Sequence, residues 1–363
     1  MRPIVIPILL LISTFFVHAQ NVTNVRVYQD GEEIVIMYDL DKRASVRVLV
    51  AAGKSNQFTE LRAVTGSVGK DISAGVNKQI TWQPLQEQTE FVAQNVRFRV
   101  EAPPNYYFSV GATKKVAFSS GNLQYTQSTN TWSFAEHQYD MLGTDNVEGG
   151  EVRVSSTPES YFRDGDTLAD KIDLFGWSGS RAIAKRGVGI STTYEDYSGD
   201  FVDWGTNIGD GKTWRTLTKA EWDYLCNGRA NAANFIGVAR IQLSESKYVN
   251  GLILLPDNWI CPTGVVFKSG FAKENSIQAY TVHQTFSISD WLKLDAVGAV
   301  FLPVSGIRYG AVVGDVHTYG NYWSATANGS LFAHYLLFVS YGAFTDSNYR
   351  YSGQAVRLVQ DYK

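Results

Sequence analysis

Cysteine is scarce in this chain. Among 363 residues only Cys226 and Cys261 are cysteines, and neither forms a CxxC pair or has a histidine partner at ligand spacing, which argues against a structural zinc site. In an exported protein the two could form one disulfide, yet the surroundings YLCNG and WICPTG also suit a buried apolar thiol. Both alternatives stay open at this point, and we predict no bound metal.

Charge is also sparse. Charged residues make up 18% of the chain, and the formal net charge is −3. Nucleic acids and anionic membranes favour partners with clustered Lys and Arg, so the sequence predicts no nucleic-acid partner. What the chain has instead is 20 Tyr, 19 Phe, 9 Trp and 32 Gly. This balance is typical of β-rich, loop-rich extracellular proteins.

Long apolar runs are absent after the first residues. The opening MRPIVIPILLLISTFFVHAQ has one Arg, an apolar run from Ile4 to Val17, and a small residue at Ala19. This pattern predicts a signal peptide over residues 1–19, and the run is too short for a comfortable membrane span. We therefore expect an exported protein without membrane insertion, at the cell surface, in the medium or in the periplasm.

Residues 20–102 show the pattern of an all-β domain. The runs EEIVIMYDL, ASVRVLVAA, KQITW and NVRFRVEA are rich in Val, Ile, Phe and Tyr, and turn residues separate them. In VRFRV, apolar and basic residues alternate, which indicates a half-solvated strand. We predict an Ig-like or fibronectin-like sandwich, followed by a stiff joint at APP, residues 102–104.

Residues 103–363 have few long periodic segments, and we predict an α+β domain rich in irregular loops with two short helices. In TLTKAEWDYLCNGR, Thr218 and Glu221 form a capping box, Leu217 can pack on Trp222, and Asn227 with the following Gly supplies the stop. The second helix lies in SISDWLKLDAVG. Short strands are expected in GLILLPD, AVFLPVS and QAVRLVQD.

Motifs for chemistry are weak. GTNIGDGKT, residues 205–213, places Thr206 where a phosphate loop needs Gly, and no apolar strand precedes it. Asp203, Asn207 and Asp210 offer oxygens to Ca²⁺, but their spacing is not that of an EF-hand loop. There is no G-x-S-x-G elbow, and none of the mature histidines has a second His at metal spacing. We predict no catalytic residue and no cofactor.

Three segments carry a resemblance to a known family. WRTLTKAEWDYL resembles the arginine-x-x-threonine-x-alanine-glutamate-tryptophan motif of formylglycine-generating-enzyme-like (sulfatase-modifying) domains, a variant of the C-type lectin fold. GNYWS, residues 320–324, is similar to that family's Gly-Asn-x-Trp turn, and AVRLV, residues 355–359, to its closing strand. The resemblance spans residues 106–363 and implies a C-type lectin fold with scaffold roles for Glu221, Trp222, Trp323 and Arg357. No cysteine follows Cys261, where the oxidising pair of the enzyme would stand.

Within that superfamily the chain is more similar to the variable proteins of Bacteroidetes diversity-generating retroelements. AVFLPVSGIRYG, GNYWSATANGS and YRYSGQAVRLV resemble the framework around their variable region. In that family, reverse-transcription errors at template adenines diversify chosen codons, often Asn codons, and the lectin fold presents the products on its ligand-binding face. The resemblance implies a variable region at about residues 305–352.

The stretch GSLFAHYLLFVSYGAF, residues 329–344, is apolar on both faces if AHYLLFVSY is a strand. One interpretation is a fully buried central strand. The other, which we prefer, buries Leu336 and Phe338 and exposes the alternate face in a binding patch. The surrounding Tyr, Ser, Gly and Asn residues form the mixture that paratopes use. The residues predicted to contact ligand are Tyr309, Val313, Asp315, His317, Tyr319, Leu331, Phe332, His334, Tyr335, Leu337, Val339, Tyr341, Phe344, Asp346, Tyr349 and Tyr351.

The sequence thus predicts a non-catalytic ligand-binding protein whose partner is a protein or glycan on a cell or phage surface. One alternative is a structural or adhesin subunit of a cell-surface assembly with a single fixed partner. Another is an oxidase of the formylglycine-generating type that uses Cys226 or Cys261.

Overall fold

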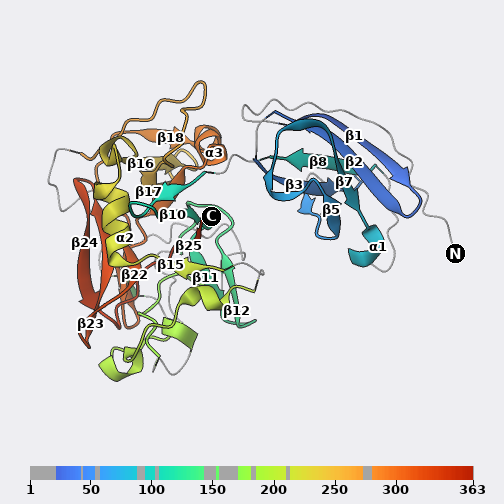
Figure 1. The fold of residues 1–363 in the computed structure, drawn as a ribbon. Helices are drawn as coiled ribbons and strands as arrows, with labels where there is room; N and C mark the ends of the chain where they lie inside the picture. Colours follow the sequence, from blue (N-terminus) through green and yellow to red (C-terminus); the bar gives the residue numbers. More distant parts are fainter. Residues whose placement is uncertain are drawn as a thin grey trace. The chain divides into compact units, whose positions relative to one another are not determined.

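The structure is a computed structural model. It describes residues 22–41, 44–53, 58–87, 95–102, 106–142, 153–154, 171–180, 185–209, 213–272 and 280–362. The predicted signal peptide lies outside the described residues. The chain divides into two compact units, Met1–Asn105 and Tyr106–Lys363 (Figure 1). This division falls at the APP joint predicted from the sequence.

The described part of the N-terminal unit is built almost wholly of strands. One sheet has the order β1-β2-β7-β5, and in the other β3 pairs with β4, β6 and β8. The elements are β1 (Val22–Asp30), β2 (Glu33–Leu40), β3 (Ala44–Ala51), β4 (Thr59–Glu60), β5 (Val64–Gly66), β6 (Gly69–Ile72), β7 (Gly75–Trp82), α1 (Pro84–Glu87) and β8 (Arg97–Glu101).

Strand alternation fills the core of this unit. Ile34, Ile36 and Tyr38 point inward from β2, and they share one buried cluster with residues of β3, β7 and β8. The four predicted runs are all strands. The sequence pattern does not predict strand β1, in which a register shift near Asn24, whose φ is +52°, interrupts the alternation.

The C-terminal unit is also mostly β, with many short strands. Its strands are β9 (Phe108–Ser109), β10 (Lys115–Phe118), β11 (Leu123–Thr126), β12 (Thr131–Phe134), β13 (Arg153–Val154), β14 (Lys171–Ile172), β15 (Arg215–Thr216), β16 (Ile236–Gln242), β17 (Tyr248–Leu254), β18 (Thr285–Ser287), β19 (Val300–Pro303), β20 (Ile307–Tyr309), β21 (Val312–Gly314), β22 (Gly320–Asn328), β23 (Phe332–Val339), β24 (Gly342–Tyr349) and β25 (Leu358–Asp361). The longest sheets have the orders β18-β16-β17-β19, β15-β25-β10-β9 and β22-β23-β24.

Both predicted helices of this unit are present, as α2 (Lys219–Asp223) and α3 (Ile288–Ala296). The capping box is confirmed, because the Glu221 backbone N–H donates to Thr218 Oγ1 at 3.2 Å and the Thr218 N–H donates to Glu221 Oε2 at 2.9 Å. A π-helical turn, Tyr224–Gly228, extends α2 to the predicted Gly stop. Neither helix is long and apolar enough to cross a membrane, and the same holds for the rest of the described chain.

Helix α2 packs on the antiparallel sheet β22-β23-β24 (Figure 1). On that side Leu336 and Phe338 are buried in one core cluster together with Trp222. The Thr345 hydroxyl donates to Asp223 at 2.8 Å and ties β24 to the helix. On the opposite side of β23, Tyr335 joins a second core cluster with Trp323. The middle of β23 is therefore covered on both faces.

Candidate ligand-binding surface

Aromatic rings gather where the open end of the β23–β24 hairpin contacts the 3₁₀ turn at Tyr194–Tyr197. Phe332 of β23 stacks on its cross-strand partner Tyr349, with ring centroids 4.5 Å apart. Tyr349 in turn stacks on Tyr351 at 5.1 Å and 8°. Tyr194, from a 3₁₀ turn at Tyr194–Tyr197, contacts Tyr349 at 5.6 Å and Tyr351 at 5.3 Å. These four rings form one continuous cluster.

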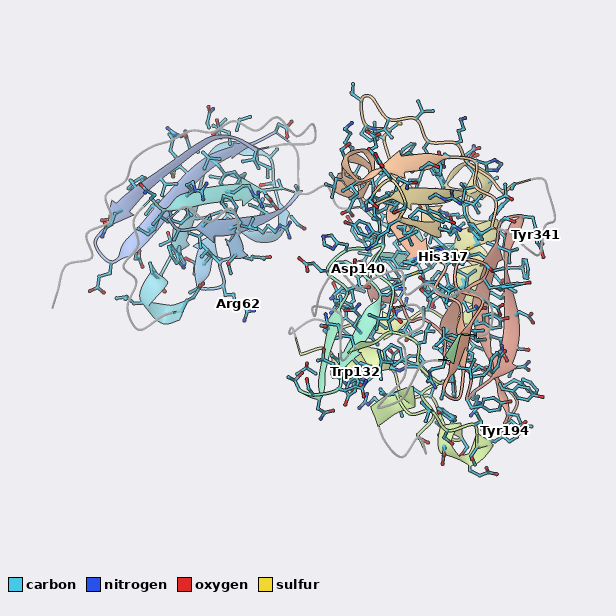
Figure 2. The ribbon with its side chains drawn as sticks, turned by 180° about the vertical axis from the view of Figure 1, so that it is seen from behind. Arg62, Trp132, Asp140, Tyr194, His317 and Tyr341 are labelled. Atoms are coloured by element: carbon cyan, nitrogen blue, oxygen red, sulfur yellow. The ribbon has the colours of Figure 1, made fainter. Side chains whose placement is uncertain are left out.

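The cluster continues into neighbouring polar and aromatic side chains. The Asn348 amide donates to the Tyr309 hydroxyl at 3.2 Å, which links β24 to β20. Burial raises the pKa of Tyr335, and its cross-strand partner Asp346, with Tyr309 and Tyr319, adds to this shift. Figure 2 shows Tyr341 and Tyr194 near opposite ends of the β23–β24 hairpin. We define the tyrosine surface as Tyr194, Tyr309, Tyr319, Leu331, Phe332, Tyr341, Phe344, Asp346, Asn348, Tyr349 and Tyr351.

Arg350 anchors this surface from below. Its guanidinium lies 4.2 Å from the centre of the Trp177 ring, and only 5% of the residue is exposed. It donates to the carbonyls of Phe332 at 3.1 Å, Gly199 at 3.1 Å and Gly329 at 2.8 Å. One side chain thus joins both ends of the loop before β23 to the segment that follows Tyr194.

A second buried arginine holds the β20 end of the surface. Arg308 is fully buried and donates to the carbonyls of Gly310 at 3.1 Å and of Leu174 and Gly187 at 3.3 Å. Its backbone pairs with Gly353, where a Cβ would lie 2.7 Å from the Arg308 Nε. A glycine is therefore required opposite Arg308, and the arginine fixes the loop that carries Tyr309.

The predicted scaffold residues occupy the interior. Trp222 donates its indole N–H to the Trp323 carbonyl at 3.3 Å, and Trp323 donates to the Phe175 carbonyl at 2.6 Å. The two carboxylate oxygens of Glu221 accept hydrogen bonds from Nη1 and Nη2 of Arg215, at 2.8 and 3.0 Å. Arg357 is buried and donates to Gln138. Burial lowers the pKa of Arg357 to about 10, so it remains charged at neutral pH.

The sixteen predicted contact residues fall into three groups. The exposed ones are Tyr309, Asp315, Leu331, Tyr341, Phe344 and Asp346. The half-buried ones are His317, Tyr319, Phe332, His334, Leu337, Tyr349 and Tyr351. The buried ones are Val313, Tyr335 and Val339.

The exposure predicted for these last three residues is wrong. Tyr335 is 6% exposed because its ring packs edge-on against Trp323, with centroids 6.1 Å apart. Val313 lies in the middle of its three-stranded sheet and belongs to the main core. Val339, 4% exposed, ends β23 just before the hairpin turn. The predicted burial of Leu336 and Phe338 is confirmed.

His317 also lies away from the tyrosine surface. Its ring meets Tyr248 of β17 edge-on at 5.6 Å, and the backbone N–H of His317 donates to the Val304 carbonyl at 2.9 Å. Burial, with a smaller contribution from Arg240, lowers the pKa of His317 to about 3. It therefore stays neutral at physiological pH and packs as part of the interior of the β16–β17 region.

Sequence reasoning missed Tyr194, Val312 and Asn348. Tyr194 stands outside residues 305–352, and nothing in its own segment, STTYEDYSGD, indicates that it meets Tyr349 and Tyr351. Val312 is 38% exposed next to the buried Val313, as strand alternation requires. An alternation count through β21 identifies Val312, but no local signal identifies Tyr194.

The candidate cation site and the cysteines have other roles. The Asp203 carboxylate accepts from Gly205 N at 2.9 Å and from Thr216 N at 2.9 Å, so it caps a turn; Asp210 lies outside the described residues. No group of three His, Cys, Asp or Glu suited to a metal occurs among the described residues.

Both cysteines are free, so the disulfide alternative is not realised. Burial raises the pKa of Cys226 to about 12, whereas Cys261 is exposed.

Comparisons with known proteins give no family model, no curated protein and no solved structure that matches this chain.

Proposed function

We propose that this protein binds a ligand through the tyrosine surface of its C-terminal unit and performs no chemistry there. The observation that carries the proposal is the continuous cluster of Tyr194, Phe332, Tyr349 and Tyr351, which joins the open end of the β23–β24 hairpin to the turn at Tyr194–Tyr197. Tyr309, whose hydroxyl accepts from Asn348, and Tyr341, in the turn at the other end of the hairpin, are also exposed. The ligand is a protein or glycan on a cell or phage surface.

The physical case rests on pre-organisation. Tyrosine offers a large contact area at a small cost in side-chain entropy, and here the rings already constrain one another by stacking. Buried Arg308 and Arg350 hold the backbone beneath them, so little further ordering is needed on binding. Solvent-exposed aromatic groups with polar neighbours are typical of interaction sites.

We further propose that the surface is the diversified face of a retroelement variable protein with an Ig-like N-terminal sandwich and a C-type lectin fold. The structure supports a division of labour in residues 305–352. Arg308, Trp323 and Arg350 serve the core together with the buried Tyr322 and Tyr335, while the Tyr309 and Tyr341 side chains reach the surface. Substitutions are then tolerated at the exposed positions and excluded at the buried ones.

The gene's neighbourhood tests this proposal. We expect a near-copy of the segment for residues 305–352 beside a reverse transcriptase gene, with mismatches confined to template adenines. Mismatched codons should encode exposed positions such as Tyr309 and Tyr341, and spare Val313, Tyr335 and Val339. Without a template copy, or with mismatches at the buried codons, diversification is wrong and a fixed adhesin subunit is favoured.

Binding itself is tested separately, on a panel of immobilised glycans and on intact bacterial cells. Tyr309→Ala and Tyr341→Ala remove side chains that are 45% and 39% exposed. Each should weaken binding about tenfold or more if it is a hot spot. Tyr28→Ala in the N-terminal unit, 47% exposed, is the matched control. Equal effects of all three variants would contradict a role for the tyrosine surface.

The oxidase alternative requires a reactive thiolate. The high pKa of Cys226 keeps that thiol protonated at neutral pH, which weighs against it as a nucleophile. Labelling the native, reduced protein with a thiol reagent should modify Cys261 and leave Cys226 untouched until unfolding. Fast labelling of native Cys226 would revive the oxidase alternative.

A further inference from the structure

A second concave site lies apart from the tyrosine surface. It is an open pocket of about 510 Å³, within the size range of small-ligand sites. In Figure 2, Trp132 at this pocket is well separated from Tyr194 and Tyr341. The β11–β12 hairpin supplies one wall, and the turns at Lys185–Gly187 and Trp204–Asn207 supply the other. The lining residues are Tyr125, Gln127, Asn130, Trp132, Arg186 and Asn207.

Arg186 is fixed in place at this pocket. Its backbone is left-handed, with φ 49° and ψ 56°, a conformation that a residue with a Cβ rarely adopts. The Trp204 indole donates to the Arg186 carbonyl at 2.9 Å, and Gly176 N donates to the Gly187 carbonyl at 2.7 Å. The guanidinium donates through Nη1 to the Asp203 carbonyl and to Thr206. The remaining edge of the guanidinium, Nε and Nη2, makes no hydrogen bond to the described residues.

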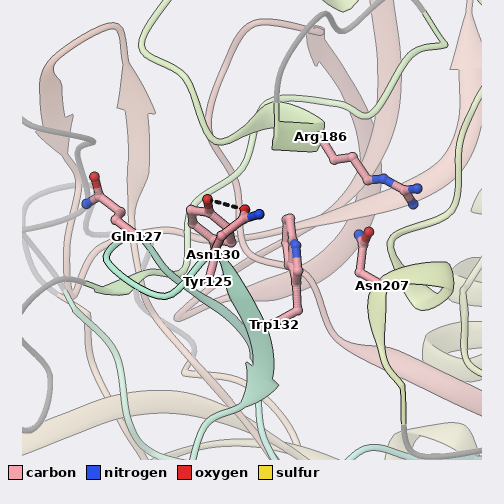
Figure 3. A pocket seen from close by; sticks show the side chains of 6 residues that line it. All are labelled: Tyr125, Gln127, Asn130, Trp132, Arg186 and Asn207. Atoms are coloured by element: carbon pink, nitrogen blue, oxygen red, sulfur yellow. Dashed lines mark hydrogen bonds between the residues drawn. The ribbon is translucent and has the colours of Figure 1, made fainter.

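The other polar groups of the pocket are also set up to donate. Within the described chain the Asn207 Nδ2 is buried without a hydrogen-bond partner. Asn130 accepts from the Tyr125 hydroxyl at 2.7 Å, which orients its amide and leaves its Nδ2 for a ligand (Figure 3). None of the lining residues is acidic. A set of fixed donors around one cation is complementary to a ligand rich in acceptor oxygens that carries a negative charge.

Trp132 gives the pocket its apolar wall. Figure 3 shows its ring between Asn130 on one side and Arg186 and Asn207 on the other. Tyr125 and Phe175 pack against the ring at 4.9 and 5.3 Å, so only part of it is open. A partly covered indole offers too little area for a stacked base, but it suits the small C–H patch of a sugar ring.

We propose that this pocket binds an acidic saccharide, with the carboxylate of a uronic acid on Arg186 and the ring hydroxyls on Asn130, Asn207 and Gln127. The sugar ring packs on Trp132. The site is independent of the tyrosine surface, so it gives the protein a second, constant specificity for anionic glycans.

The probe is methyl β-glucuronoside, titrated against the full chain and followed by NMR. A ligand of about 14 non-hydrogen atoms at ordinary ligand efficiency has a Kd of about 1 mM. We expect saturable binding in this range, and at least about tenfold weaker binding of the uncharged methyl β-glucoside, since it lacks the charge-assisted pair. Absence of saturation at about ten times this Kd, or equal affinity for both sugars, would overturn the proposal.

Two nearly isosteric variants test the assignment to this pocket. Asn207→Asp places a carboxylate on the same side of Trp132 as Arg186, beside the bound anion, and should weaken glucuronoside binding at least about tenfold. Asn130→Asp, on the other side of the Trp132 ring, replaces an amide that donates to a sugar hydroxyl and should weaken binding by a smaller factor. Asn231→Asp is the control, because Asn231 is exposed, has a φ of 57° close to the 53° of Asn130, and does not line the pocket. Melting temperatures verify folding, and Arg186→Lys serves if an Asp variant unfolds. Wild-type affinity for the glucuronoside in the pocket variants would refute the assignment to this pocket. Tighter binding of adenosine monophosphate than of the glucuronoside would refute the proposed acidic saccharide.

Discussion

The two units of the chain use arginine in opposite ways. In the N-terminal unit Arg47 and Arg99 are about half exposed, and both pair with Glu101 at 2.6 and 2.7 Å on the outer face of a sheet. In the C-terminal unit Arg308, Arg350 and Arg357 are buried and donate to carbonyl or amide oxygens.

The difference follows from how each unit is ordered. Long ladders such as β1-β2-β7 order the N-terminal unit, and its surface ion pairs add only about 0–1 kcal/mol each. The C-terminal unit has irregular segments whose carbonyls have no ladder partner. Buried guanidinium groups satisfy several of these oxygens at once and join segments that are distant in sequence. Four predictions test this contrast, in order of decreasing effect.

The largest effect is expected for Arg308→Ala. It removes the hydrogen bonds from the buried guanidinium to the carbonyls of Gly310, Leu174 and Gly187, and should cost at least about 3 kcal/mol in the free energy of unfolding of the C-terminal unit. Arg47→Ala should cost less than about 1 kcal/mol in the N-terminal unit. Calorimetry on both variants measures the two costs, and similar costs would remove the contrast.

Two tyrosines of the β23–β24 hairpin test the distinction between a buried ring that stabilises the fold and an exposed ring that is free to bind a ligand. Tyr335→Ala removes a ring that is 6% exposed and should cost about 3–5 kcal/mol. Tyr341→Ala, at a residue 39% exposed, should stay within about 0.5 kcal/mol. Chemical denaturation followed by far-UV circular dichroism gives both values. A Tyr335 variant as stable as the Tyr341 variant would show that the ring is not core.

The part of the pH effect that comes from histidine should be confined to the C-terminal unit, because all four histidines after His18 lie there. The pKa of His317 is lowered from 6.5 to about 3, so between these values the unfolded state takes up a proton that the folded state refuses. Stability is present above pH 6.5 and is lost as the pH falls, by at most about 1.4 kcal/mol per pH unit.

Comparison of the wild type with His317→Asn isolates this contribution, since Asn tolerates the φ of 64° found here. Urea titrations at several pH values between 7 and 5 give the free energy of unfolding at each pH. This free energy should fall less steeply with decreasing pH in the variant than in the wild type. Identical slopes would mean that His317 protonates freely in the folded state.

The smallest effect concerns the helix start. Thr218→Ala removes the hydroxyl half of the capping box of α2 and should cost about 1 kcal/mol. Ser287→Ala at the N-cap of α3 is the matched variant and should cost a similar amount, because its hydroxyl also accepts one backbone N–H. Thermal unfolding measures both. A neutral Thr218 variant would mean that the interior packing of Trp222 alone positions α2.

Local patterns predicted much of the fold. Alternation identified β2, β3, β7 and β8, and the capping residues placed α2 and α3, because these signals act within a few residues. For β23, the pattern could not decide which face is covered, since both faces are apolar. The packing of Tyr335 on Trp323 decided it, and that contact depends on the pairing of β22 with β23.

The sequence by itself determined the mostly β character, the helix caps and the strand at residues 333–341 that corresponds to β23, since short-range periodicity and turn chemistry encode them. Only the tertiary structure decided that Tyr194 joins Tyr349 and Tyr351, and that Arg186 and Asn207 face Trp132 across one pocket. These contacts are made by residues of irregular segments, and buried hydrogen bonds to residues distant in sequence fix the backbone conformation of those segments. No local sequence pattern specifies the backbone conformation of such a segment.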